Sequence, residues 1–356
     1  MTRTNTFEQS IGATIEGQYT LTRSVERVTQ MGDRFKVLNL ADCTGGVRVY
    51  AWEHSGLLER VPATTPTPIQ ARLYVRRFHG ETIANLQAVR ELDAHEVDNG
   101  AALLAWEACS VNARPALGKL ADFVDQLEPK LLRQFLNRVL TDPRIASSIT
   151  TCKGSFKHHH HEPGGLLAHS VEVMEIAGDM AGARLNPLEK AMTQVAALLH
   201  DLGKVRAVGS GNIRPTHYLL VSHESQTIRM LDPHLEWLRD RSPQIAAGLD
   251  YTLEFLAKHP AERGRALFLA GDLVCAADRM SAALDNHKGL DSLLAKTLPK
   301  QQPKAPPSST RARRNTPKTN ATNHQFDIVA RHETHAAHRT RHQPNNNIQE
   351  GPFPWI

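Results

Sequence analysis

Residues 195–204 read VAALLHDLGK, and this stretch decides how the second half of the chain is interpreted. Asn186, just before a proline, is a typical helix start, and Gly203 is a typical stop. The predicted helix therefore carries His200 and Asp201 at the end of an apolar run. A histidine and a carboxylate are costly to bury side by side unless something compensates their polarity. A divalent cation is the natural compensation, so the stretch predicts a metal site.

A histidine-rich stretch, HHHHEPGGLLAHS at residues 158–170, precedes that helix. A purification tag would sit at a terminus, whereas this run lies between two segments of helical periodicity, so it belongs to the fold. His169 shares an apolar helical stripe with Val173 and Ile176, at i, i+4 and i+7. A lone histidine there would more often be a core residue. With His200 and Asp201, however, it completes a mixed set of ligands that suits Mn²⁺, Fe²⁺, Ni²⁺, Mg²⁺ or Zn²⁺.

These residues, together with Asp278 in LVCAADRMSAAL, form the pattern H…HD…D. The pattern and the string HDLGK resemble the HD-domain superfamily of metal-dependent phosphohydrolases. The resemblance implies that His169, His200, Asp201 and Asp278 hold the metal, and that the HD aspartate can bridge two ions. Lys204 is then expected as an exposed positive charge at the mouth of the site, where negative charge builds up on phosphoryl oxygens.

Residues 12 to about 290 also resemble the YhaM-type 3′-5′ exoribonucleases in domain order and in the HHxxxGGLLxH segment. This resemblance implies that His159 and His160 line the pocket and that His223 is a further ligand or a catalytic acid. Such proteins carry a His-His-Gly before the last aspartate, where this chain has only His259. The resemblance therefore implies one complete metal site and leaves a second one open.

The histidine-rich string is similar to a second family as well, the TraI/MobH-type relaxases of mobile elements. Pro163, just before the diglycine, favours this relative, which implies nicking of DNA at a transfer origin. The strand-rich N-terminal domain described next favours the exoribonuclease instead. A third alternative is a nucleic-acid adaptor without activity, in which the metal only braces the helices.

Residues 12–95 are predicted to form short strands, with RFKVLNLAD and GGVRVYAWE on either side of a turn. Arg48, Tyr50 and Trp52 alternate with apolar residues, which gives a face suited to base stacking, unless the rings simply pack against a neighbouring domain. The segment resembles an OB-fold nucleic-acid-binding domain found ahead of certain hydrolases. The residues that carry this resemblance are Gly32, Phe35, Leu38, Leu40, Asp42, Thr44, Gly45 and Trp52. The basic-aromatic run 72–81 adds Phe78 to the expected binding residues.

Charge is distributed unevenly along the chain. Residues 295–356 hold ten Lys and Arg against three acids, a net of +7, while the rest of the chain has a net of −2. This tail is rich in Pro, Asn and Thr, so it is predicted to be disordered, and either binds phosphates or only keeps the protein in solution. The four cysteines show no CxxC spacing, which argues against a zinc ribbon and a disulfide framework, and no stretch approaches 18 apolar residues. A cytoplasmic protein without membrane contact is expected.

The sequence therefore predicts a multidomain α and β protein. A small OB-fold-like β-barrel at 12–95 precedes a helical HD domain at 101–294 and a disordered basic tail at 295–356. The expected activity is metal-dependent cleavage of single-stranded RNA or DNA, first of all as a 3′-5′ exonuclease with Mn²⁺. His200, Asp201, Lys204 and His223 are the expected catalytic residues. The oligomeric state is left open.

Overall fold

A computed structural model describes residues 5–105, 109–156, 160–182, 184–211, 216 and 220–284 of the chain. The chain divides into two units, 1–295 and 296–356, and everything described below lies in the first. The predicted basic tail and His159 fall outside the described residues. Within the described part, no helix has both the length and the apolar composition needed to cross a membrane.

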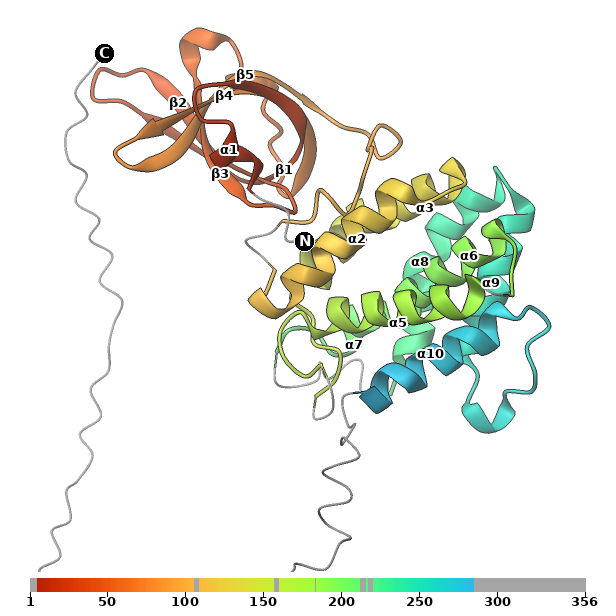
Figure 1. Cartoon of the computed structure of the whole chain (residues 1–356). Helices are drawn as coiled ribbons and strands as arrows, with labels where there is room; N and C mark the ends of the chain where they lie inside the picture. Colours follow the sequence, from red (N-terminus) through yellow and green to blue (C-terminus); the bar gives the residue numbers. More distant parts are fainter. Residues whose placement is uncertain are drawn as a thin grey trace, which may run out of the picture. The chain divides into compact units, whose positions relative to one another are not determined.

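The N-terminal part is a closed barrel with the strand order β1-β2-β3-β5-β4 (Figure 1). All pairs are antiparallel except β3 with β5, which is the arrangement of an OB-fold. The interior is apolar and includes Leu38, Leu40, Val49 and Leu73, which are fully buried. The strands are β1 (Thr14–Val28), β2 (Arg34–Ala41), β3 (Gly46–Trp52), β4 (Thr67–Phe78) and β5 (Glu81–Glu91).

The sequence patterns identify β2 to β5 but not β1. Only the centre of β1, from Tyr19 to Leu21, is continuously buried, and the pairing register shifts between Leu21 and Arg23. The alternation of apolar and polar residues that marks a strand is therefore broken in its middle. The strand is nevertheless essential for the barrel, because it pairs with both β2 and β4 and closes the sheet.

The second part is helical (Figure 1), and α2 to α6 and α8 to α10 all contribute buried side chains to one apolar core. Helix α5 packs against α6, which follows it directly, and against α10, which lies about ninety residues further along the chain. The predicted order of a small barrel followed by a helical domain is confirmed. The helices are α2 (Arg114–Gln126), α3 (Lys130–Thr141), α4 (Pro143–Ile149), α5 (Gly165–Gly182), α6 (Pro187–Leu199), α7 (Lys204–Ala207), α8 (His223–Arg239), α9 (Pro243–Ala257) and α10 (Ala270–Leu284).

Helix α6 begins as predicted but ends earlier. Asn186 accepts a hydrogen bond from the Glu189 backbone N–H, and the Glu189 side chain accepts one from the Asn186 N–H, which makes a complete capping box. The helix stops at Leu199 rather than at Gly203, and residues 200–203 form a turn before α7. The histidine and the aspartate therefore lie in a tight turn, where they can point into a site instead of along a helix face.

Asp142 lies between α3 and α4 and also contacts α8. Its carboxylate accepts hydrogen bonds from the backbone N–H and the guanidinium of Arg144, and His234 Nε2 of α8 lies 3.0 Å from Oδ2. Burial alone would raise the pKa of Asp142, but these hydrogen bonds lower it from 3.8 to about 2. The charged form of Asp142 is therefore preferred in the folded protein, and the stability that it contributes is present above about pH 4 and lost as the pH falls toward 2.

We expect Asp142→Ala to lower the free energy of unfolding at pH 7 by about 1–3 kcal/mol, because a helix cap and a charged hydrogen bond are lost together. The difference from the unmodified protein should shrink as the pH falls from 4 toward 2. Urea unfolding followed by circular dichroism measures both quantities. The control is Asp179→Ala, an exposed aspartate of α5, which should change stability by less than about 0.5 kcal/mol. Equal effects of the two variants would contradict the role given to Asp142.

Candidate functional site

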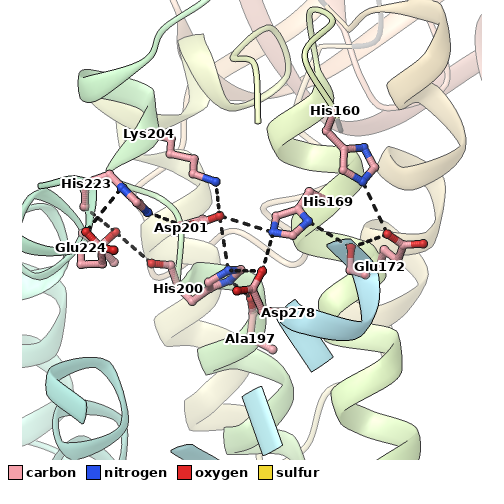
Figure 2. Close-up of polar contacts among 12 residues, drawn as sticks. His160, His169, Glu172, Ala197, His200, Asp201, Lys204, His223, Glu224 and Asp278 are labelled. Carbon is pink, nitrogen blue, oxygen red and sulfur yellow. Dashed lines mark hydrogen bonds and ion pairs between the residues drawn. The ribbon is translucent and has the colours of Figure 1, made fainter. Parts of the chain in front are cut away.

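Four predicted residues converge on one point between α5, α6 and α10 (Figure 2). His169 Nε2 of α5 lies 3.4 Å from Asp201 Oδ2 and 3.2 Å from Asp278 Oδ1. His200 Nε2 lies 3.3 Å from Asp201 Oδ2 and 3.8 Å from Asp278 Oδ1. His169 and Asp201 are almost fully buried, whereas the side chain of Asp278 is 45% exposed. The cluster is therefore enclosed by the helices but open on the side of Asp278.

The diglycine ahead of α5 lets the histidine-rich segment pack against the start of that helix. Gly164 has a φ of +81°, which a residue with a side chain rarely adopts. A Cβ atom on Gly165 would lie 2.0 Å from the carbonyl oxygen of His160. Both positions thus require glycine, and the helix that presents His169 can begin directly beside His160.

Gly203 likewise allows two backbone segments to pack closely together, on the other side of the site. A Cβ atom there would lie 1.9 Å from the His223 carbonyl oxygen. The first turn of α8 therefore packs directly against the backbone of the turn at residues 200–203, called the HD turn below. The Gly203 N–H donates to Thr227 Oγ1 over 2.8 Å, which holds the two segments together. This contact brings His223 Nε2 to within 3.0 Å of Asp201 Oδ1.

The charges in this cluster depend on one another. Burial alone would lower the pKa of His200, but the neighbouring Asp201 and Asp278 carboxylates raise it to about 10. Burial opposes the charged form of Asp201 as well, yet His200 and Lys204 hold the pKa of Asp201 well below its usual range. The pKa of His169 is raised by the same two carboxylates against the effect of burial. Two carboxylates in a buried site therefore require positive charge, from protons on the imidazoles or from a cation.

The donor set fits a divalent metal ion. Ligands of one ion at about 2.0–2.2 Å lie within about 4.4 Å of one another, and the four distances above fall inside that limit. His200 Nδ1 is held by the Ala197 carbonyl oxygen at 2.7 Å, whereas Nε2 is buried and has no hydrogen-bond partner. A buried imidazole nitrogen that faces two carboxylates, with the other ring nitrogen held by a backbone carbonyl oxygen, is the arrangement of a metal ligand. The residues His169, His200, Asp201 and Asp278 can thus hold such an ion.

Two predictions about neighbouring residues need correction. Lys204 is not exposed: its side chain is 17% exposed, and its Nζ lies 2.5 Å from Asp201 Oδ2, because the turn folds α7 back over the aspartate. His259 does not reach the cluster; it is exposed and caps a short 3₁₀ turn at residues 260–262. His160 lies beside the His169 ring, at 5.4 Å between centroids, but its Nε2 faces Glu172 Oε2 at 3.5 Å rather than the aspartates.

Two residues of the site were missed by the sequence analysis. Ser281 Oγ lies 3.1 Å from His169 Nδ1 and donates a hydrogen bond to Glu172 Oε2 over 2.5 Å. Ser281 follows Asp278 by three residues on α10, and Glu172 follows His169 by three residues on α5. Helical spacing therefore puts both one turn beyond a predicted ligand, and this signal could have identified them.

On the barrel, the predicted aromatic face extends over β2, β3 and the 3₁₀ turn that follows β3. Trp52 stacks on Phe35 of β2 with 5.0 Å between ring centroids, and Tyr50 and His54 continue the row on either side. Phe78 lies apart from this row, at the β4–β5 turn, with the Arg76 guanidinium 5.3 Å above its ring. Phe35 and His54 were not among the expected binding residues, because the sequence does not reveal which side chains are neighbours across strands.

Basic residues flank the aromatic row. In the register of β1, β2 and β3, Arg27 lies opposite Phe35, and Arg23 lies opposite Asn39, which in turn pairs with Arg48. Directly opposed residues of antiparallel strands point to the same face, so the three arginines and the rings share one surface. Arg48 also forms an exposed ion pair with Glu81, at 3.1 Å.

The chain is similar to known proteins. Residues 166–283, which contain the whole cluster, match the model of the HD domain family. A 3'-5' exoribonuclease YhaM from Bacillus velezensis is 22% identical over 239 residues, covering 66% of this chain and 74% of the relative. The protein of the same name from Bacillus subtilis is 22% identical over 240 residues, covering 66% of this chain and 74% of the relative.

A solved structure, the second OB-fold domain of replication protein A from Methanococcus maripaludis, is 17% identical and covers 24% of this chain and 86% of that chain, with a TM-score of 0.19. Taken together with the cluster of histidines and aspartates, the HD domain match and the two relatives support a metal-dependent phosphohydrolase or nuclease of the HD type.

We expect Gly203→Ala to lower the free energy of unfolding by about 1–3 kcal/mol, because the added methyl group pushes α8 away from the HD turn. The control is Gly118→Ala in α2, where an added Cβ would meet nothing within 4 Å and should leave stability unchanged or raise it by about 0.5–1 kcal/mol. Thermal unfolding of the two variants measures the difference. A Gly203→Ala protein as stable as the Gly118→Ala protein would contradict the close contact described here.

Proposed function

We propose that this protein is a divalent-metal-dependent exonuclease that shortens single-stranded RNA from its 3′ end. The observation that carries the proposal is the convergence of the Nε2 atoms of two histidines and the carboxylates of two aspartates at one buried point. The relatives named as 3'-5' exoribonucleases support the substrate and direction. Mn²⁺ is the metal proposed first, since histidine and aspartate together suit it, with Mg²⁺, Fe²⁺, Ni²⁺ and Zn²⁺ as the alternatives.

In this proposal, His169, His200, Asp201 and Asp278 hold the ion. When bound, a divalent cation lowers the pKa of water and polarises a phosphoryl oxygen. Asp201 has the central position, because its Oδ2 faces both imidazoles and Lys204. The open side next to Asp278 gives the scissile phosphodiester access to the site.

His223 is the residue proposed to act on the leaving group. Its side chain is 32% exposed, and its ring is held between Asp201 Oδ1 at 3.0 Å and Glu224 Oε2 at 3.4 Å. A ring fixed from both nitrogens and still open to solvent can pass a proton to the oxygen that leaves. Lys204 contributes through Asp201: its ammonium offsets part of the carboxylate charge and keeps the aspartate in place.

The barrel is proposed to bind the single-stranded RNA. Phe35, Tyr50 and Trp52 offer a row of half-buried rings on which successive bases can stack, and the arginines around them offer contacts to phosphates. Stacking of this kind is largely independent of sequence, which suits an enzyme that removes one nucleotide after another.

We expect His200→Ala to remove bound metal and to reduce hydrolysis of 5′-labelled single-stranded RNA by at least about a hundredfold. Metal analysis of the purified protein and gel separation of the products are the measurements. His259→Ala is the control, because that histidine lies away from the cluster, and it should retain both metal and activity.

The same gel tests the alternatives. A ladder that shortens from the 3′ end supports the proposal. Faster cleavage of labelled DNA than of labelled RNA would indicate that DNA is the substrate. A single cut in supercoiled DNA would instead indicate a relaxase. Binding without cleavage would indicate an adaptor, and hydrolysis of free nucleotides alone a small-molecule phosphohydrolase. Full activity of His200→Ala would refute the assignment of the site.

We expect Trp52→Ala to weaken binding of a single-stranded oligonucleotide by about 1–3 kcal/mol, because one stacking ring is lost. Hydrolysis of a small phosphodiester such as bis(p-nitrophenyl) phosphate should not change, since this substrate needs only the metal site. Tyr74→Ala removes an exposed ring from β4, away from the aromatic row, and serves as the control. Fluorescence anisotropy measures the binding. Equal losses in the two variants would mean that the row has no special part in binding.

A further inference from the structure

A chain of three side chains connects the candidate metal centre to a carboxylate outside it. His169 Nδ1 lies 3.1 Å from Ser281 Oγ, and Ser281 Oγ donates to Glu172 Oε2 over 2.5 Å (Figure 2). Ser281 is completely buried, so its hydroxyl group has no water to bond with. The His169 ring is held in this way on the side opposite to Asp201 and Asp278.

The direction of each hydrogen bond follows from the number of protons available. Ser281 has one hydroxyl proton, and Ser281 donates this proton to Glu172 Oε2, which accepts it. The serine oxygen can then only accept from His169, so the hydrogen of the neutral imidazole must be on Nδ1. Nε2, which faces Asp201 and Asp278, is left with its lone pair free to bind a cation.

We propose that Glu172 and Ser281 are positioning residues that fix the tautomer and the orientation of His169, so that its Nε2 is ready for the metal. The inference rests on the metal site of the proposed function, but not on the nature of the substrate. A histidine ligand generally donates its other ring N–H to a carboxylate or a carbonyl, and here a buried serine transmits the effect of the carboxylate. His200 has the simpler arrangement, with the Ala197 carbonyl oxygen in the same role.

An alternative use of these residues is a ligand set of their own, formed by His160 and Glu172 beside His169. The geometry favours the positioning role for two reasons. His169 Nδ1, the ring nitrogen on this side, is already engaged with Ser281. Glu172 Oε2, the oxygen 3.5 Å from His160 Nε2, is the same atom that accepts from Ser281.

The experiment uses the full chain, stripped of metal by a chelator and titrated with Mn²⁺ while free Mn²⁺ is followed by electron paramagnetic resonance. Ser281→Ala and Glu172→Gln should each weaken Mn²⁺ binding about 10- to 100-fold. Ser281→Thr keeps the hydroxyl group and should bind nearly as well as the unmodified protein. Glu175→Gln, one turn further along α5 and paired with Lys119, is the matched control and should bind normally.

A second measurement reports the tautomer directly. In the metal-free protein labelled with ¹⁵N-histidine, at a pH where the His169 ring is neutral, long-range ¹H–¹⁵N correlation should show His169 protonated at Nδ1, and Ser281→Ala should give a mixture of both forms. Circular dichroism of the metal-free variants separates this effect from unfolding. The proposal is overturned if folded Ser281→Ala and Glu172→Gln bind Mn²⁺ normally, or if His160→Ala weakens binding while Ser281→Ala does not.

These outcomes are independent of the proposed function. Weaker Mn²⁺ binding by Ser281→Ala supports the positioning role even if no nucleic acid is cleaved. Normal binding by that variant overturns the role even if RNA is degraded. Absence of Mn²⁺ binding by the unmodified protein would refute the metal site itself.

Discussion

The burial of the Asp201 carboxylate is the constraint on which the helical part depends. This side chain is 6% exposed, and an ionised carboxylate so far from water needs positive charge and hydrogen bonds close by. His169, His200, Lys204 and His223 all direct a nitrogen at it, from α5, the HD turn, α7 and α8. Four nitrogen atoms from successive elements of the helical part are thus held around one buried carboxylate.

Bringing this many groups around one carboxylate requires separate backbone segments to approach one another unusually closely. Gly165 and Gly203 are the two positions where it does, since an added Cβ at either would lie within about 2 Å of a carbonyl oxygen. Each glycine lies next to a residue that matters for the site, His160 in one case and His223 in the other. The glycines of the GGLL and HDLG motifs are therefore part of the site's geometry as much as the histidines are.

The sequence predicts those features of this protein that depend on the spacing of residues within one segment. The apolar run before His200, the helical position of His169 and the alternation in β3 are all local patterns, and they predict a metal site and a strand-rich domain. Asp278 came only from the resemblance to the HD-domain superfamily. The partners across segments could not be predicted in the same way. Arg27 faces Phe35 only because of the register between β1 and β2, and Lys204 is buried only because the turn after α6 folds it over the aspartate.

The surroundings of Asp201 also indicate how many ions the described residues can hold. On the Oδ2 side, two imidazoles and a second carboxylate complete a ligand set for one ion. On the Oδ1 side, the described part of the chain offers His223, while His259 lies away and caps a turn. Lys204 supplies a further positive charge next to the aspartate. One divalent cation and the Lys204 ammonium group would therefore offset the charge of the two carboxylates, and a second ion on the Oδ1 side would need ligands besides His223.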